Sequence, residues 1–197
     1  IFWVNLTNKV TCVDLGGRRI IKKKNGSTNV FNWISNFCSR PLIEGKIGKG
    51  TKVWRWSHIS KGALVGDNCM IGANVYIGPN VYIGHGCRIQ NGVYLPEGVT
   101  INNGVFIGPN TTFLNHKHTG FRYFEDKLWY EHFEKSQSKA DKIYVGQYAI
   151  IGGGCTILPR VRIGKYSVIG AGSLVTKNTK DNTLNYGHPC RFVKDIN

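Results

Sequence analysis

The sequence lacks several features that would place it across a membrane or around a metal. It has no run of about 18 apolar residues, the length that a membrane-spanning helix needs. Its six cysteines include no Cys-x-x-Cys pair and no Cys/His cluster with the spacing of a zinc site. The apolar run at residues 1–4 is too short for a signal peptide. We therefore expect a cytoplasmic protein without a metal. The initial Ile in place of Met is typical of a trimmed chain or of one domain of a longer protein.

Acidic residues are also scarce. The 197 residues include 26 Lys and Arg but only 11 Asp and Glu, a formal net charge of +15. Such an excess implies an anionic partner, whether nucleic acid, an acidic membrane or small phosphorylated ligands, unless the lysines are simply a solvated surface. The hydrophobic content of 41% indicates a globular chain, which the length limits to one sizeable domain and a small appendage.

An apolar residue recurs at every sixth position over most of the chain. Counting from Ile47 to Val175, seventeen of eighteen such positions are Ile, Val or Leu, and the other is Phe113. The count breaks once, between Phe113 and Val145. A small or β-branched residue stands two positions before each apolar one, and Gly often follows it.

A period of six is neither the 3.6 of an α-helix nor the two of a long strand. It fits short strands that each end in a sharp turn, where Gly replaces a side chain whose Cβ would clash. Three strands make a triangular coil, so eighteen hexapeptides predict an all-β parallel β-helix of six coils, stacked about 4.8 Å apart. Its left-handed sense is taken from the known hexapeptide fold, because parallel crossovers are otherwise right-handed.

This pattern assigns residues 47–197 to the β-helix, with an insertion at 114–142 between coils four and five. Residues 1–46 are expected to form a small cap over the open end, with strands near 1–6 and 9–14, a basic turn and a short helix near 30–38. Cys69, Cys87 and Cys155 occupy the small inward position, so we expect them to be core residues. Aromatic residues that directly precede core positions are expected to point outward, toward another subunit: Tyr76, Tyr82, Tyr94 and Phe106.

Four short motifs resemble those of the hexapeptide-repeat acyltransferases, in particular the nucleotide-amino-sugar N-acetyltransferases. The segment VWRWSHI at 53–59 is similar to their Val-Trp-x-Phe-x-His-Ile element, and IQN at 89–91 matches their Ile-Gln-Asn. GPNTTFLN at 108–115 precedes the insertion as in that family, and GHPCR at 187–191 resembles its closing Gly-x-Pro-Ala-Arg. The likeness covers about residues 50–197. One departure is His116-Lys117-His118, where many relatives continue with Asn-Pro-Arg.

The resemblance implies a homotrimer with sites at its subunit seams. It also implies transfer of an acetyl group from acetyl-CoA to the amine of a UDP- or dTDP-linked 3- or 4-amino-dideoxyhexose. Because an ammonium is not nucleophilic, a base is needed, and histidine suits this near neutral pH. We assign this role first to His116 and then to His118, with Asn91 as a further catalytic residue; both histidines could instead be ordinary exposed loop residues. The substrate-binding candidates are Asn115, Lys117, Arg88 and His85.

The co-substrate acetyl-CoA would need a backbone N–H to polarise its thioester and cations for its phosphates. Gly153 or Gly154 would supply the N–H, and Gly172 lies in the next corresponding corner. The candidate cations are Lys165, Lys177, Lys180 and Arg191.

Other functions of the same fold remain open at this point. An O-acetyltransferase or serine acetyltransferase differs only in its acceptor. A γ-class carbonic anhydrase would need His-x4-His, whereas this chain has His-x-His, and position 85 should face Asn103 on the next coil. A scaffold without chemistry is a further alternative. No recognised nucleic-acid module is present and no apolar run is long enough to span a membrane, so neither nucleic acid nor a membrane is the expected partner.

Overall fold

The computed structural model describes residues 3–5, 9–13, 19–20, 40–116 and 141–196. The chain divides into two compact units, Ile1–Cys38 and Ser39–Asn197. In the first unit, strands β1 (Trp3–Asn5), β2 (Lys9–Val13) and β3 (Arg19–Ile20) pair antiparallel in the order β1-β2-β3. The two strands predicted near 1–6 and 9–14 are therefore present. The predicted helix near 30–38 lies outside the described residues.

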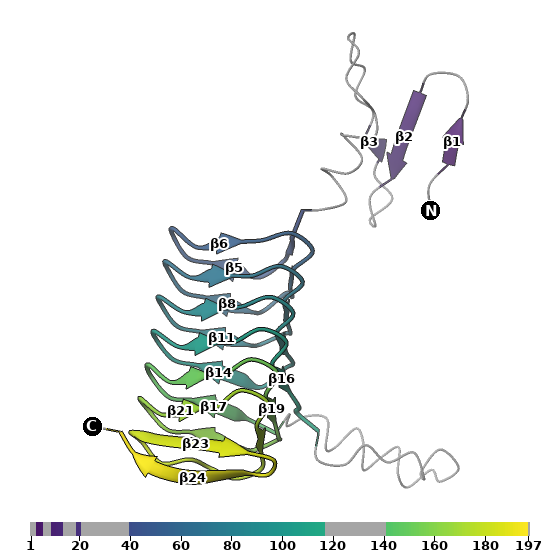
Figure 1. Cartoon of the computed structure of the whole chain (residues 1–197). Helices are drawn as coiled ribbons and strands as arrows, with labels where there is room; N and C mark the ends of the chain where they lie inside the picture. Colours follow the sequence, from purple (N-terminus) through teal and green to yellow (C-terminus); the bar gives the residue numbers. More distant parts are fainter. Residues whose placement is uncertain (1–2, 6–8, 14–18, 21–39, 117–140, 197) are drawn as a thin grey trace, which may run out of the picture. The chain divides into compact units, whose positions relative to one another are not determined.

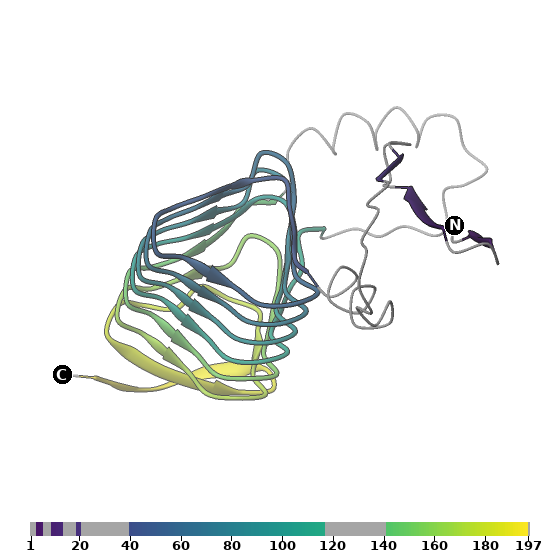
Figure 2. The same cartoon turned by 90° about the horizontal axis from the view of Figure 1, so that it is seen from above.

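The second unit is a parallel β-solenoid whose strands fall on three sheets (Figures 1 and 2). The seven-stranded sheet contains β4 (Leu42–Ile43), β7 (His58–Ile59), β10 (Tyr76–Ile77), β13 (Tyr94–Leu95), β16 (Thr112–Phe113), β19 (Thr156–Ile157) and β22 (Leu174–Val175). The six-stranded sheet contains β5 (Lys46–Ile47), β8 (Leu64–Val65), β11 (Tyr82–Ile83), β14 (Val99–Ile101), β17 (Ile143–Val145) and β20 (Arg162–Ile163).

The eight-stranded sheet runs to the C-terminal end of the solenoid. It contains β6 (Lys52–Val53), β9 (Met70–Ile71), β12 (Arg88–Ile89), β15 (Phe106–Ile107), β18 (Ile150–Ile151), β21 (Val168–Ile169), β23 (Thr183–Gly187) and β24 (Cys190–Asp195). The last two strands form an antiparallel hairpin, and β23 joins it to β21 in parallel (Figure 1). No helix long and apolar enough to cross a membrane occurs in the part of the chain that the structure describes.

The six-residue repeat produces this stacking directly. Where the repeat is uninterrupted, paired residues lie 18 positions apart, as in Tyr76 with Tyr94 and Ile77 with Leu95, so each turn uses three hexapeptides. From Ser57 to Val175, the apolar residue of each hexapeptide and the small residue two positions before it point inward and are almost completely buried. The side chain between them points outward. The core is therefore a continuous column of aliphatic side chains along the solenoid.

The glycine that follows a core residue is required by close approach between turns. A Cβ on Gly72 would lie 2.6 Å from the backbone N of Asn91 on the next turn. The left-handed backbone of the corners falls two residues later, where Asn and Gly predominate, as at Asn74 (φ 56°) and Gly92 (φ 69°). The glycine pattern therefore reflects the tight spacing of the turns rather than the bend itself.

The buried cysteines are core residues, as predicted. Cys69, Cys87 and Cys155 are at most 1% exposed, and each thiol donates to a backbone carbonyl of the next turn, for example Cys155 to Gly170 at 3.2 Å. Burial raises the pKa of the Cys155 thiol. A buried thiol that resists ionisation is a poor nucleophile, so Cys155 stabilises the core. The hydrogen bond with the Cys87 side chain lowers the pKa of Cys69 to about 6, but the Cys69 and Cys87 side chains are equally buried and belong to the same core.

The solenoid has about seven turns, one more than the six predicted. It begins before residue 47, because β4 already pairs with β7 through Leu42 and Ile43. The step from Ile43 to Ile47 is four residues instead of six, so counting by six found Ile47 and Val53 of the first turn but not its first strand, β4. That residues 1–46 cap the open end stays a prediction.

Three edges join the three sheets, and most of the predicted site residues lie on these edges. Edge A joins the six-stranded to the eight-stranded sheet, edge B joins the eight-stranded to the seven-stranded sheet, and edge C joins the seven-stranded to the six-stranded sheet. The insertion at 114–142 lies on edge C, between β16 and β17.

Candidate functional site

The predicted site residues are distributed over all three edges. Edge A carries His85, Lys165 and Lys180; edge B carries Asn91, Gly153, Gly154 and Gly172; edge C carries Asn115, His116 and Lys177. Within one chain, the seven-stranded sheet separates His116 from Asn91 and the glycines. The structure of a single chain therefore does not bring the predicted base and the predicted oxyanion donors together.

The insertion leaves edge C at a fixed point. The Leu114 N–H donates to the Ile157 carbonyl at 2.9 Å, so the chain is still in the solenoid at this residue. The Asn115 side-chain amide then donates to the Glu97 carbonyl, one turn earlier, at 3.1 Å. His116 follows directly and is exposed. His116 therefore reaches solvent from a segment that is hydrogen-bonded to the preceding turn through Asn115 and to the next turn through Leu114.

The insertion also returns at a fixed point. Asp141 is only 14% exposed and forms an ion pair with Arg160 on the next turn of edge C. At the exit, Glu97 on the preceding turn is itself held, because Asn80 donates to its carboxylate at 3.0 Å.

Lys117 and His118 lie outside the described residues, so their assignments stay predictions. Sequence reasoning missed Glu97, although its position 18 residues before Asn115 marks it as the neighbour one turn away.

On edge B, Asn91 has a structural partner. Its side-chain oxygen accepts the Ala73 N–H at 2.8 Å. The same bond recurs on edge A, where Asn103 accepts the His85 N–H and Asp67 accepts the Lys49 N–H. Asn91 therefore belongs to a set of side chains that cap the corner of the preceding turn. Its predicted catalytic role stays a prediction.

The glycines of edge B differ in what their N–H groups do. The Gly154 N–H donates to Pro109 and the Gly172 N–H to Gly153, each at 2.8 Å. No acceptor for the Gly153 N–H occurs among the described residues. Next to Gly154 and Gly172, which have φ values of 67° and 69°, nothing lies within 4 Å of where a Cβ would stand. Edge B thus offers bare backbone, and Gly153 is its available donor.

On edge A, His85 faces Asn103 across adjacent turns, as predicted. Its Nδ1 lies 3.0 Å from the Asp67 N–H and 3.4 Å from the Asp67 carboxylate. His85 is therefore held by the solenoid itself.

Lys165 lies on the same edge. Its backbone N–H donates to the Asp181 side chain, and its own side chain is exposed.

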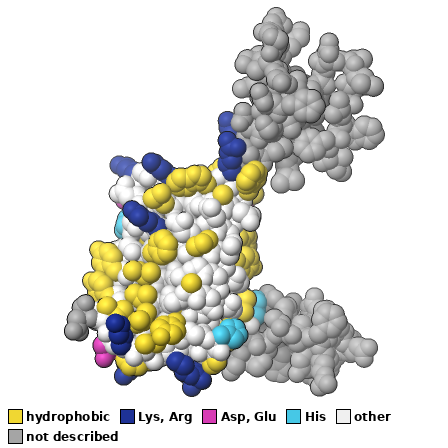
Figure 3. Space-filling model, in the orientation of Figure 1, with side chains coloured by type: hydrophobic (Ala, Val, Ile, Leu, Met, Phe, Trp, Pro, Cys, Tyr) yellow, Lys and Arg dark blue, Asp and Glu magenta, His cyan; other side chains and the backbone are white. Residues whose placement is uncertain are grey.

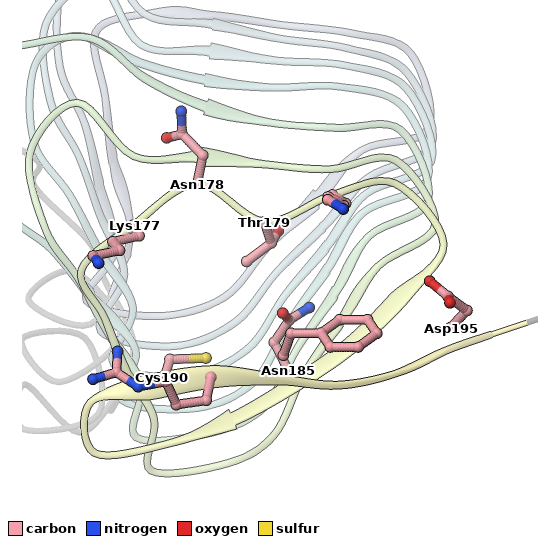
Figure 4. Close-up of a pocket in the computed structure, with 9 residues that line it drawn as sticks. Lys177, Asn178, Thr179, Asn185, Cys190 and Asp195 are labelled. Carbon is pink, nitrogen blue, oxygen red and sulfur yellow. The ribbon is translucent and has the colours of Figure 1, made fainter.

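Three of the predicted phosphate-binding cations line one cavity of about 660 Å³ at the C-terminal end of the solenoid (Figure 4). These are Lys177, Lys180 and Arg191; Lys165 is not in its lining. The other lining residues are Asn178, Thr179, Asn185, Cys190, Phe192 and Asp195. Burial raises the pKa of the Cys190 thiol, so this sulfur adds no charge. With three cations against one carboxylate, the cavity favours an anion.

The aromatic side chains that precede core positions point outward, as predicted. Tyr82 and Tyr94 are 42% and 43% exposed, and Tyr94 stacks on Tyr76 with ring centroids 5.0 Å apart. Arg88 is on the eight-stranded sheet between Met70 and Phe106. In residues 40–116 and 141–196, no three His, Cys, Asp or Glu side chains are grouped as a metal site.

Two family models match parts of the chain. The bacterial transferase hexapeptide model, described as six repeats, matches residues 142–177. The model of the GMPPB C-terminal domain matches residues 53–110. Both regions lie within the solenoid, one on each side of the insertion.

One curated relative is a galactoside O-acetyltransferase from Lactococcus lactis, 36% identical over 56 residues, which cover 28% of this chain and 27% of that protein. Among solved structures, a histidine-to-alanine mutant of GDP-perosamine N-acetyltransferase from Caulobacter crescentus, in complex with CoA and GDP-perosamine, matches with a TM-score of 0.59 at 19% identity. The match covers 78% of this chain and 58% of that one. A hexapeptide-repeat acetyltransferase from Vibrio cholerae, in complex with acetyl-CoA, matches with a TM-score of 0.52 at 21% identity, over 88% and 80% of the two chains. These likenesses establish the left-handed β-helix fold.

Proposed function

The chain belongs to the hexapeptide transferase repeat family, and from this premise we propose that it transfers an acetyl group from acetyl-CoA to an amine. The proposed acceptor is a nucleotide-linked amino deoxy sugar, with UDP or dTDP as the carrier and the amine at C3 or C4. A chain that spans 58% of the perosamine enzyme and 27% of the galactoside enzyme does not inherit their activities, so the proposal rests on its own residues.

The observation that carries the proposal is the exposed histidine at the exit of the insertion. His116 follows Asn115, whose amide is held by the Glu97 carbonyl at 3.1 Å, so the start of the insertion is tied to the rigid stack. A base that must meet a substrate amine needs both exposure and a fixed origin. Edge C supplies both at this residue.

In the proposed reaction, the neutral sugar amine attacks and the imidazole of His116 takes a proton from its nitrogen as the new bond forms. The nitrogen forms a bond to the thioester carbonyl carbon, and the carbonyl oxygen becomes an oxyanion. The Gly153 N–H stabilises this oxyanion, since the N–H groups of Gly154 and Gly172 already donate within the edge B ladder. The C–S bond then breaks, and the CoA thiolate leaves and takes up the proton from His116.

The cations of the C-terminal cavity would hold the CoA phosphates. Lys177, Lys180 and Arg191 surround the same cavity, and charge-assisted hydrogen bonds to phosphate are strong. Edge B, with its bare glycine corners, would receive the thioester end. Lys165, Lys117 and Arg88 remain candidates for the other phosphates.

Because His116 and Gly153 lie on different edges, a complete site would need edge C of one chain to face edge B of another. This matches the predicted homotrimer with sites at its seams. In a ring of three chains, each such contact is head-to-tail, so each seam takes one histidine and one glycine corner from different subunits. Chains carrying His116→Ala mixed with chains carrying Gly153→Trp should then recover about one quarter of the wild-type activity, because random assembly restores that share of the seams. No recovery would mean that both residues act within one chain or not at all.

The test of the activity is thiol release from acetyl-CoA against UDP- and dTDP-linked sugars with amines at C3 or C4, beside neutral sugar nucleotides. Turnover with one amino sugar establishes the reaction and its acceptor. Binding of CoA without turnover on any of them would keep an acyltransferase but reject this acceptor class. Absence of both would reject acetyl transfer and favour a scaffold.

A second candidate is O-acetylation of a sugar. The galactoside O-acetyltransferase likeness supports it, at 36% identity over 56 residues. The same histidine would then take a proton from a hydroxyl instead of an amine. Neutral sugars in the same panel separate the two reactions.

A further inference from the structure

Most of the net positive charge lies in the first third of the sequence, which contains none of the residues proposed for the site. Residues 1–61 contain 12 of the 26 Lys and Arg but only 2 of the 11 Asp and Glu, which places +10 of the net +15 in this third of the chain. Residues 62–113 contain Arg88 as their one cation, against Asp67 and Glu97. None of the residues proposed for acetyl-CoA or the sugar lies before residue 85. Small phosphorylated substrates therefore do not account for most of the charge.

In the described part of this region, the cations surround the first turn of the solenoid. We call this surface the N-terminal collar; it contains Trp54, Trp56 and six exposed cations, Arg40, Lys46, Lys49, Lys52, Arg55 and Lys61. Among the described residues, none of the six forms an ion pair. Figure 3 shows Lys and Arg side chains at this end of the solenoid and again at the opposite end, with few between. The one carboxylate in this stretch, Glu44, lies 3.2 Å from His58 Nε2, so the six cations of the collar exceed its counter-charge.

The collar also exposes large apolar side chains. Trp56 is 63% exposed and Trp54 is 43% exposed on the same corner of edge B, on either side of Arg55. Leu42 and Leu64, outward residues of two neighbouring sheets, are 49% and 44% exposed. Apolar and cationic side chains therefore alternate around one end of the solenoid.

Trp56 occupies a position where a tryptophan is unfavourable. Its φ is 58°, and the residues at the same place on the next turns of edge B are Asn74, Gly92, Asn110, Gly154 and Gly172. Those residue types tolerate left-handed backbone, whereas a bulky side chain there costs free energy. Tyr148 and Tyr166 on edge A also take this backbone, but their rings stack on each other with centroids 5.4 Å apart. Among the described residues no aromatic ring stacks on Trp56, so its mostly exposed side chain is open to an external contact.

We propose that the N-terminal collar binds the surface of an anionic membrane, with Trp54 and Trp56 in the headgroup region and the surrounding cations against acidic lipids. Tryptophan favours the membrane interface, and basic residues are attracted to acidic headgroups. Exposed leucines gain from a lipid surface but not from the phosphates of a nucleic acid. Residues 1–38 are themselves basic, so they do not supply the missing negative charge. A peripheral contact of this kind does not need a membrane-spanning segment. The absence of such a segment was the ground for expecting no membrane partner.

The test is cosedimentation of the full chain with vesicles of phosphatidylcholine alone or with 30% phosphatidylserine, at about 0.1 M and 0.5 M salt. We expect binding only to the acidic vesicles, weakened by salt, with a blue shift of tryptophan emission. Each cation near an acidic surface strengthens partition about fivefold, so Lys49→Glu, Lys52→Glu and Arg55→Glu together should weaken it by about 100-fold or more. Trp54→Gln with Trp56→Asn, the residue types found at these places in later turns, should abolish the blue shift.

The matched control reverses three exposed cations near the other end of the solenoid, Lys142→Glu, Arg162→Glu and Lys194→Glu, and should leave most vesicle binding intact. Thermal unfolding of each variant shows that the fold persists. Equal partition onto neutral and acidic vesicles, or equal loss in both triple variants, would overturn the proposal. So would tight binding of a single-stranded polynucleotide with no binding to vesicles, which would make the partner a nucleic acid. None of these outcomes depends on acetyl transfer.

Discussion

Edges B and C of the solenoid show opposite chemistry. At edge B, the corners at 152–154 and 170–172 consist of glycine and one alanine, and they expose backbone. At edge C, the corners carry functional side chains, among them Glu97, Asn115, His116 and Arg160. The hydrogen bonds of the corners differ as well: at edge B the Gly172 N–H donates to Gly153 on the preceding turn, whereas at edge C the Val161 N–H donates to Leu158 within its own turn. Edge B therefore offers bare backbone, suited to a thioester, and edge C offers functional side chains, suited to an amine.

The largest expected effect is on edge C. His116→Ala should lower kcat by about 100-fold or more, the usual contribution of a general base. The measurement is thiol release at saturating acetyl-CoA, with thermal unfolding to show that the variant is folded. His118→Ala is the comparison within the same insertion and should cost less. If both variants keep a near-normal rate, no histidine of the insertion is the base.

The next effect is on edge B. Gly154→Asn with Gly172→Asn should raise the KM for acetyl-CoA about 10-fold with a smaller change in kcat, because the added side chains occupy the bare corner. Asn is tolerated at this backbone position, as Asn74 and Asn110 show on the same edge. The control is Gly86→Asn on edge A, where φ is 67° and the space beside it is equally open. A similar rise in KM for the control would show that edge B has no special role.

A smaller effect is expected where the insertion is anchored. Asn115→Ala removes the hydrogen bond to the Glu97 carbonyl. The loss of such a bond corresponds to roughly a 3- to 10-fold decrease in a rate or equilibrium constant. If the bond positions His116, the loss should appear in kcat and leave the KM for both substrates nearly unchanged. A change in the KM of the sugar alone would instead support the predicted contact of Asn115 with the substrate. Asn80→Gly, which removes a bond to Glu97 one turn away, is the control.

The smallest expected effect is at the return of the insertion. Arg160→Asn removes the ion pair with Asp141, in which the arginine side chain is 68% exposed. Exposed pairs contribute about 0.2–1 kcal/mol, and salt screens them. Chemical denaturation should show a loss of free energy of unfolding within that range, smaller in 0.5 M NaCl. A loss well above it, unaffected by salt, would mean that the pair supports packing as well as charge.

The repeat made most of the fold predictable. Residues such as Ile77 and Leu95 recur every six positions because each must enter the same core, so the stack of turns follows from counting. Strand β4 of the first turn was missed because the step from Ile43 to Ile47 is two residues shorter than the repeat. Within the site, the neighbourhood of Glu97 and Asn115 was readable from their separation of one turn. The role of Asn91 in capping Ala73 depends on backbone geometry that the sequence pattern does not contain.

The most direct test of the proposed reaction compares two acceptors that differ at one atom. Thiol release from acetyl-CoA should be measured with a UDP- or dTDP-linked amino deoxyhexose and with the same sugar carrying a hydroxyl in place of the amine. The proposal predicts turnover with the amine and only background hydrolysis with the hydroxyl, and His116→Ala should remove most of the first. Equal or faster turnover of the hydroxyl sugar would contradict N-acetylation and identify an O-acetyltransferase.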